Sequence, residues 1–130
     1  MEQFPVALPA KAANGLFLKG DKQNFQYFVA CENYKVYGYT SNGKPLQGWN
    51  PKPRVGTIPF AIQYTEDKGK DYIILTNVDG TLLYYNGSGD RHERPIRLEA
   101  EFDQPFYIYE HNKTFTLINA SKEHMLFTVN

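Results

Sequence analysis

Short apolar segments separated by polar turns run along the whole chain. The segments are rich in Tyr, Phe, Ile, Val and Thr and are bounded by Gly, Asn, Asp or Pro, as in "YFVAC" (27–31), "DYIIL" (71–75) and "TLLYY" (81–85). This pattern predicts short β-strands joined by tight turns. No stretch shows the apolar period of an amphipathic helix, and "SKEHMLF" (121–127) is better explained as a turn followed by a strand.

The turns between the apolar segments carry their own signals. Asn42-Gly43, Asp79-Gly80 and Asn86-Gly87 are dipeptides that supply the positive φ angles of tight hairpins. Pro51 and Pro53 interrupt strand pairing, because proline has no backbone N–H to donate. We therefore expect hairpins at the three dipeptides and a crossing between two larger units near the two prolines.

The pattern of strands and turns recurs with a period of 43 to 46 residues. "KVYGYTSNG" (35–43) aligns with "TLLYYNGSG" (81–89) at an offset of 46, since 81 − 35 is 46. A third copy follows, because "MLF" (125–127) aligns with "LLY" (82–84) at an offset of 43. Four antiparallel strands in a repeat of about this length are typical of a propeller blade.

These observations predict an all-β fold, namely a partial β-propeller of about three four-stranded antiparallel blades. The units are expected at residues 12–52, 55–98 and 102–130 of a single domain, with residues 4–8 as a trailing or closing strand. A β-sandwich or barrel is the alternative. The segment 27–31 is apolar on both faces, which favours a strand packed between two neighbouring sheets.

The two ends of the pattern do not match. The third copy stops after its third strand, and "FPVAL" (4–8) resembles the last strand "RPIRL" (94–98) of the second copy. Either the chain is a fragment of a longer protein, or residues 4–8 pair beside 125–129, within one chain or between two. Open blade ends would expose apolar faces. We therefore expect self-association, with another copy or other parts of the parent protein as partners.

Composition and charge narrow the classes of function. Lys plus Arg and Asp plus Glu both number 14, so the formal charge is zero and nothing indicates a nucleic-acid or membrane partner. Cys31, the single cysteine, lies in an apolar run and is expected to be buried. The chain contains no apolar run long enough for a bilayer span, and its start lacks the features of a signal peptide.

No motif for catalysis or metal binding stands out. His92, His111 and His124 are too far apart in sequence for a metal-ligand pattern, and His92 is expected to be solvated. "NVDGT" (77–81) is explained as a hairpin turn rather than a calcium loop, and "TEDKGKD" (65–71) as a solvated turn. We therefore expect a non-catalytic module, not an enzyme, with no cofactor and no bound metal.

Trp49 is the only tryptophan and has two interpretations. It could fill the seam between two blades. Alternatively, Trp49 could form an exposed platform with Tyr37 or Tyr39, on which a sugar or peptide stacks. These three residues are the candidate ligand-binding residues. The expected function is structural or protein–protein interaction, and binding of a carbohydrate or another small ligand is the alternative.

Several stretches resemble a known class of proteins. "VYGYTSNGKPLQGWNPKP" (36–53), "KDYIILTNVDGTLLYYNGSGD" (70–90) and "PFYIY" (105–109) are similar to the C-terminal repeat region of large uncharacterised bacterial proteins. Those regions are described as propeller-like, quinoprotein-like or WD-like repeats. The resemblance covers residues 4 to about 110. It implies a longer parent protein in the cell envelope, with the periplasm as the suspected location, and it implies no assigned activity.

Overall fold

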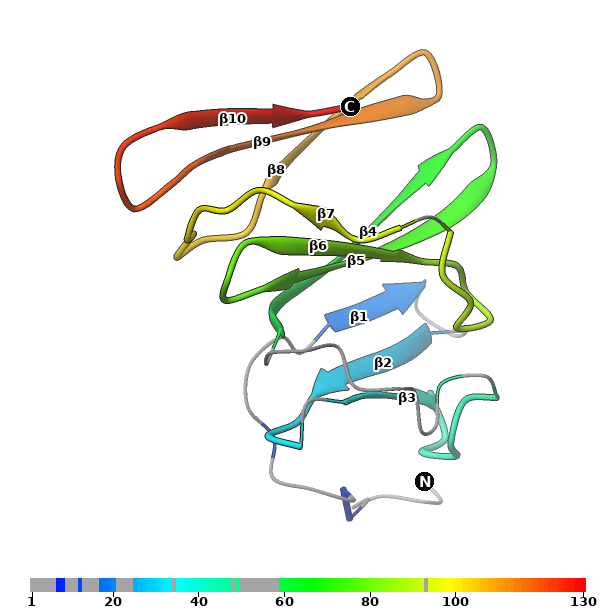
Figure 1. The fold of residues 1–130 in the computed structure, drawn as a ribbon. Helices are drawn as coiled ribbons and strands as arrows, with labels where there is room; N and C mark the ends of the chain where they lie inside the picture. Colours follow the sequence, from blue (N-terminus) through cyan, green and yellow to red (C-terminus); the bar gives the residue numbers. More distant parts are fainter. Residues whose placement is uncertain are drawn as a thin grey trace.

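The computed structural model describes residues 7, 8, 12, 17–20, 25–33, 35–47, 49, 59–92 and 94–130. These residues form ten strands and no helix, and all strand pairs are antiparallel (Figure 1). The all-β prediction is confirmed. Because the strands form three separate sheets, the described residues do not form a closed barrel. None of them belongs to a helix with the length and apolarity that crossing a bilayer demands.

Each sheet is a meander in which consecutive strands are neighbours. The first sheet contains β1 (Phe17–Gly20), β2 (Phe25–Ala30) and β3 (Val36–Thr40). The second sheet contains β4 (Pro59–Asp67), β5 (Lys70–Asn77), β6 (Thr81–Tyr85) and β7 (Ile96–Arg97). The third sheet contains β8 (Tyr107–His111), β9 (Thr114–Ala120) and β10 (Leu126–Val129). Among the described residues the second sheet has the four strands expected of a full unit, the first sheet has three, and the third sheet has the three strands at which the third copy stops.

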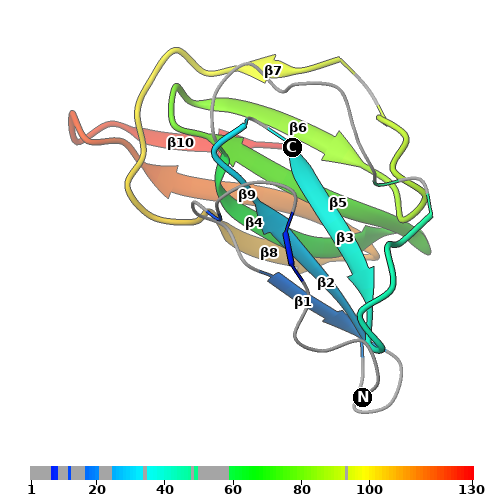
Figure 2. The same cartoon turned by 90° about the horizontal axis from the view of Figure 1, so that it is seen from below.

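The three sheets are stacked in sequence order, with the second sheet in the middle (Figure 1). Figure 2 shows the same stack from below, with β2 and β3 of the first sheet in front of β5 and β6. Residues 4–8 were expected to form a strand, but Ala7 and Leu8 are not in one, and residues 4–6 lie outside the described residues. Leu8 packs against the first sheet, at the opposite end of the stack from β10.

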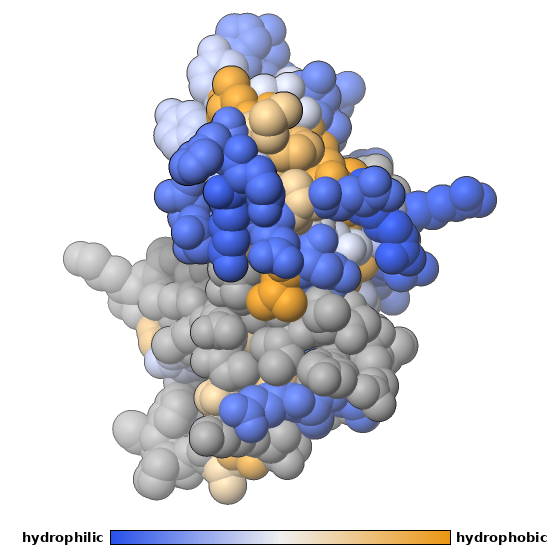
Figure 3. Space-filling view, turned by 60° about the vertical axis from the view of Figure 1, so that its left-hand side comes forward, coloured by the Kyte–Doolittle hydropathy of each residue, from blue (hydrophilic) through white to orange (hydrophobic). Residues whose placement is uncertain are grey.

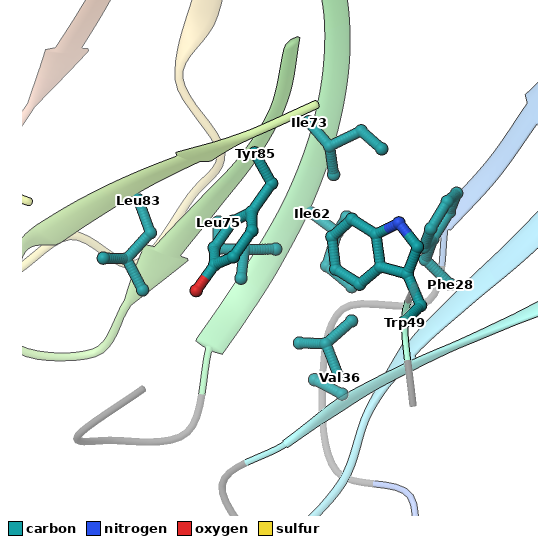
Figure 4. Close-up of a cluster of buried hydrophobic side chains, with 9 residues drawn as sticks. Phe28, Val36, Trp49, Ile62, Ile73, Leu75, Leu83 and Tyr85 are labelled. Atoms are coloured by element: carbon teal, nitrogen blue, oxygen red, sulfur yellow. The ribbon is translucent and has the colours of Figure 1, made fainter. Parts of the chain in front are cut away.

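A separate apolar cluster fills each of the two spaces between the sheets. Between the first and second sheets, Trp49 lies among side chains from both (Figure 4). The members of this first cluster are Phe28, Ala30, Val36, Trp49, Ile62, Ile73, Leu75, Leu83 and Tyr85. The buried members of the second cluster are Ile74, Leu82, Tyr84, Phe102, Phe106, Phe115 and Leu117. The side chains of β5 and β6 alternate between the two clusters, as the pleat of a strand requires.

The outer face of the first sheet is also buried. Val29, Cys31, Tyr37 and Tyr39 form a third apolar cluster there, with Leu8 packed against it. Their exposed fractions are all 9% or less. The first sheet is therefore buried on both of its faces, as the apolar segment 27–31 predicts, and Cys31 is buried as expected.

The expected hairpin turns form, with one correction. Gly43 and Gly80 have positive φ angles of 87° and 85°, as their dipeptides predict. Gly87 does not, and Gly89 takes the left-handed conformation instead, with φ of 86°. The loop is a four-residue turn from Asn86 to Gly89, and the Gly89 N–H donates to the Asn86 carbonyl oxygen at 3.1 Å. The left-handed residue is therefore the fourth residue of the turn and not Gly87. The same four-residue loop occurs between Thr40 and Gly43.

Candidate functional site

Three of the exposed large hydrophobic residues of the described structure, Tyr107, Tyr109 and Leu126, lie on the outer face of the third sheet. Strand alternation and the burial pattern place Phe115, Leu117 and Phe127 against the second sheet and turn the other side chains outward. We call this outward surface the open face. Its side chains are those of Tyr107, Tyr109, His111, Thr114, Thr116, Ile118, Ala120, Leu126 and Thr128.

Large apolar side chains on the open face are accessible to solvent. Leu126 is 74% exposed, Tyr107 is 65% exposed and Tyr109 is 47% exposed. Figure 3 views the stack from the side and shows hydrophobic residues at the surface in its upper part, between hydrophilic flanks. Exposed apolar groups that gather on one face of a protein often mark an interaction site.

The central positions of the open face have buried counterparts in the other two sheets. In the second sheet, Ile74 lies between Gln63 on β4 and Tyr84 on β6, and in the third sheet Ile118 lies between Tyr107 on β8 and Thr128 on β10. Each offset is 44 residues, for example 118 − 74. In the first sheet the corresponding residues of β2 and β3 are Phe28 and Gly38, at an offset of 46.

In the first and second sheets, residues at these positions pack against the sheet that follows. Phe28 packs into the cluster beneath the second sheet, and Ile74 and Leu82, both fully buried, pack beneath the third. Leu126, which lies 44 residues after Leu82, has no such cover among the described residues and is exposed instead. The open face is therefore the one sheet face at this end of the stack on which no sheet is packed in the described structure.

Hydrogen bonds join the second sheet to the third through two residues of β4. The side-chain amide of Gln63 donates to the Phe106 carbonyl oxygen at 2.7 Å and accepts from the Phe106 N–H at 3.1 Å. The hydroxyl of Thr65 donates to the Glu110 carboxylate at 2.6 Å. Tyr107 and Tyr109 take the places of Gln63 and Thr65 in the third sheet, and both are exposed.

The open face carries no Asp, Glu, Lys or Arg side chain, although 22% of the whole chain is charged. Its only titratable side chains are Tyr107, Tyr109 and His111. The rings of Tyr109 and His111 are stacked, with centroids 6.0 Å apart and an interplanar angle of 12°. The face is thus a surface of aromatic, aliphatic and hydroxyl side chains.

A cleft of about 690 Å³ lies between the first hairpin turns of the second and third sheets. Glu66, Lys68, Glu110 and Lys113 contribute side chains of both charges to its lining. The Lys68 N–H donates to the Lys113 carbonyl oxygen at 2.6 Å, which holds the two turns together. The segment 65–71 is a turn with exposed residues at its tip, as expected, and it also forms a wall of this cleft and contacts the third sheet.

A second polar cluster lies beside the seam of the first two sheets. The Tyr64 hydroxyl oxygen is 2.7 Å from Asp71 Oδ1 and 2.9 Å from Glu66 Oε2. Burial raises the pKa of the Tyr64 phenol above its ordinary value, and the hydrogen bonds to the two carboxylates add to the shift. His92 was expected to be solvated, but its ring stacks on Tyr72 at 4.0 Å, and its Nε2 lies 2.6 Å from the Asp71 carbonyl oxygen.

The three candidate ligand-binding residues from the sequence do not lie together at the surface. Trp49 is fully buried between the first and second sheets, and its Nε1–H donates to the Gly87 carbonyl oxygen at 3.1 Å. Tyr37 and Tyr39 point to the opposite face of the first sheet and are only 4% and 8% exposed. Trp49 therefore has the position that the seam interpretation requires and offers no exposed indole face for a ligand.

The sequence reasoning missed Tyr107, Tyr109 and Leu126. Their alternation within the segments 105–110 and 125–129 was visible in the sequence, but which side would be covered depends on packing between distant segments. The sequence alignment of the third copy on the second, at an offset of 43, placed Leu126 on Leu83, whereas the strand register of the structure gives an offset of 44 and places Leu126 on Leu82. A difference of one residue moves a side chain to the other face of its sheet.

The described residues contain no group of three or more His, Cys, Asp or Glu side chains that could hold a metal ion. No protein-family model matches the chain, and no curated protein matches it at a significant level.

Proposed function

We propose that this chain is a non-catalytic β-propeller-type repeat module whose role is structural or protein–protein interaction. In this proposal each sheet is one blade-like unit, and the open face is where a protein surface docks. The single observation that carries the proposal is the exposure of Leu126 at a position whose counterpart, Leu82, is fully buried by the next sheet.

The common register of the sheets supports the repeat. The residues opposite each other on the second and third strands are Phe28 and Gly38, Ile74 and Tyr84, and Ile118 and Thr128. Turn geometry also agrees, since the loop after β5 and the loop after β9 both close with a left-handed fourth residue, Gly80 and His124. Units that bury their faces only by stacking are the hallmark of repeat architectures. The resemblance to envelope-protein repeats is consistent with this proposal.

The experiment adds one more unit. A copy of residues 55–98 is joined after Asn130, and Tyr107→Gln with Tyr109→Thr restores the side chains by which the second sheet holds the third. We expect the added strands to be protected from hydrogen exchange and the chain to unfold at a higher temperature. A matched control carries Leu75→Asn and Leu83→Asn within the added copy only, and it should gain neither property.

An added copy that exchanges as fast as its control would contradict the proposal, because a propeller-type face should accept a further unit of the same kind. The original chain, without the added copy, gives the reference for both exchange and unfolding temperature. The added copy belongs to the same chain as the third sheet. Its protection from hydrogen exchange therefore does not depend on whether two chains associate.

Carbohydrate binding is the second candidate, and the exposure of two tyrosines favours it. Tyr107 and Tyr109 lie on the same side of β8 with their rings accessible, and aromatic faces stack on the apolar faces of sugar rings. Titration with oligosaccharides, followed by NMR of the labelled tyrosine rings, tests this function. Shifts confined to Tyr107 and Tyr109 would support it, and unchanged spectra across neutral and acidic glycans would remove it.

A further inference from the structure

We propose that two copies of this chain bind each other through their open faces, related by a twofold axis that runs along β9. The proposal rests on the interaction role of the open face given above and names its partner. In this arrangement Ile118 of one copy lies near Ile118 of the other. Tyr107 of each copy then lies over Thr128 of the other, because Tyr107, Ile118 and Thr128 form one row across the sheet.

The charge of the open face favours an identical partner. A twofold contact places each side chain near itself or near one other member of the same face. A charged side chain on the axis would meet its own copy, and one off the axis would be buried without a partner unless the face supplied an opposite charge, and both are costly when water is excluded. The open face has no Asp, Glu, Lys or Arg side chain, so a copy of the face meets it without repulsion.

The shape of the open face favours the same partner. Large rings lie along β8, at Tyr107 and Tyr109, whereas small Thr128 lies across the sheet on β10. Rotation about an axis along β9 brings β8 of one copy over β10 of the other. The large ring of Tyr107 then meets the small side chain of Thr128, which favours close packing between the two sheets.

The two ends of the stack differ, and this favours a closed dimer over a chain of many copies. The outer face of the first sheet is buried, with Val29, Cys31, Tyr37 and Tyr39 all at most 9% exposed. Only the third sheet presents an open apolar face among the described residues. A molecule with one such face binds one other copy, and the resulting dimer has no open face left to bind a third copy.

Sedimentation velocity over a range of concentrations tests the association. We expect dimers of the original chain and at least tenfold weaker association for Leu126→Glu, because the new charge would be buried at the contact. Val78→Glu is the matched control, since Val78 is 45% exposed but lies in the turn between β5 and β6. Val78→Glu should dimerise like the original chain, and thermal unfolding checks that both variants fold.

A charge exchange tests the geometry. Tyr107→Lys and Thr128→Asp should each be monomeric alone, because each would bury unpaired charges in a homodimer. A mixture of the two variants should form a heterodimer, since the lysine of one copy lies over the aspartate of the other. Mixing Tyr107→Lys with Leu126→Asp is the control, and it should restore less association because these positions do not oppose each other.

The outcomes separate this proposal from the proposed function. An original chain that stays monomeric at high concentration overturns the dimer, and so does a mixture that fails to associate when each homodimer has been lost. Neither result affects docking of an added repeat unit in one chain. Conversely, a dimer with restored association by charge exchange would stand even if the added unit stayed unprotected.

Discussion

Gly80 shows how a single residue sets the approach of two segments. It follows β5 in the turn to β6, with a φ angle of 85°. Its carbonyl oxygen accepts a hydrogen bond from the Leu98 N–H at 3.2 Å, just after β7. A Cβ atom at this position would lie only 1.9 Å from the Ala100 carbonyl oxygen. Glycine is therefore required here both for its backbone conformation and for space.

Gly80→Ala should destabilise the fold by more than Gly69→Ala. Gly69 has nearly the same φ angle, 84°, but nothing lies within 4 Å of a Cβ atom built there. Gly69→Ala should thus cost only the left-handed conformation, on the order of 1–2 kcal/mol. Chemical denaturation of both variants measures the difference in free energy of unfolding, which we assign to the clash with Ala100. Equal losses would show that the segment after β7 moves freely away.

Individual residues were predictable from the sequence only where the cause is local. Asn-Gly and Asp-Gly dipeptides identify Gly43 and Gly80 because the turn itself requires positive φ. Gly87 misled the prediction, since the choice between Gly87 and Gly89 depends on where the flanking strands end. The sequence also left two interpretations of Trp49, because burial of an indole depends on a segment far along the chain, here the one containing Gly87.

At the scale of strands and turns, corresponding hairpins use corresponding backbone conformations. The turn between β4 and β5 has φ angles of 53° at Lys68 and 84° at Gly69. The turn between β8 and β9 has φ angles of 53° at Asn112 and 63° at Lys113. Two positive φ angles in succession are the mark of the type I′ hairpin, for which Asn-Gly is the favoured pair. Lys113 thus stands where the equivalent turn has glycine.

Lys113→Gly should stabilise the chain. The left-handed conformation of Lys113 is unfavourable for a residue with a Cβ atom, and glycine adopts it freely. The greater flexibility of glycine in the unfolded chain offsets part of the gain, so we expect about 0.5–1 kcal/mol. Thermal unfolding measures the change, with Lys113→Ala as a control that should bring no gain. A lower unfolding temperature for Lys113→Gly would mean that the lysine side chain itself stabilises the turn.

Strands were the most predictable elements. Apolar and β-branched runs bounded by turn residues located β2, β3, β5, β6 and β10, because strand formation follows from residues close in sequence. The expected strand at residues 4–8 failed for Ala7 and Leu8. Its assignment rested on likeness to residues 94–98, and even there only Ile96 and Arg97 form β7. A short edge strand depends mostly on its partner and leaves little pattern of its own.

The described residues form a stack of three sheets in which the second sheet packs against the first on one face and the third on the other. Leu117 is fully buried in the cluster between the second and third sheets, whereas Phe28 and Trp49 belong to the other cluster. In such stacks the stability of each part depends mainly on its own contacts and on those with the next part. A change in one cluster should therefore affect the adjacent sheets first.

Leu117→Ala should destabilise the third sheet in particular. Removing a buried leucine side chain from a packed core costs about 2–5 kcal/mol. Hydrogen exchange followed by mass spectrometry should show faster exchange in residues 107–129 and a smaller change in residues 25–40. Phe28→Ala is the reciprocal variant and should reverse this preference. Equal acceleration throughout the chain in both variants would indicate that the three sheets unfold as one cooperative unit.

Arrangement at this scale was the least predictable from the sequence. The period of 43 to 46 residues indicated successive similar units, but it could not show which side of each sheet would meet its neighbour. Tyr107 and Leu126 were therefore not recognised as exposed, although strand alternation puts them on one face. The side that a sheet buries is decided by contacts between segments that are far apart in sequence.

The place of the single tryptophan has a practical consequence for spectroscopy. Indole emission depends strongly on polarity around the ring, and here the ring lies in the space between the first two sheets only. Its fluorescence should report the opening of that space and stay nearly silent when the third sheet detaches. Near-ultraviolet circular dichroism of the tyrosine side chains, by contrast, would change both when that space opens and when the third sheet detaches. A stopped-flow experiment with the two signals could therefore time the separation of each end of the molecule without any added label.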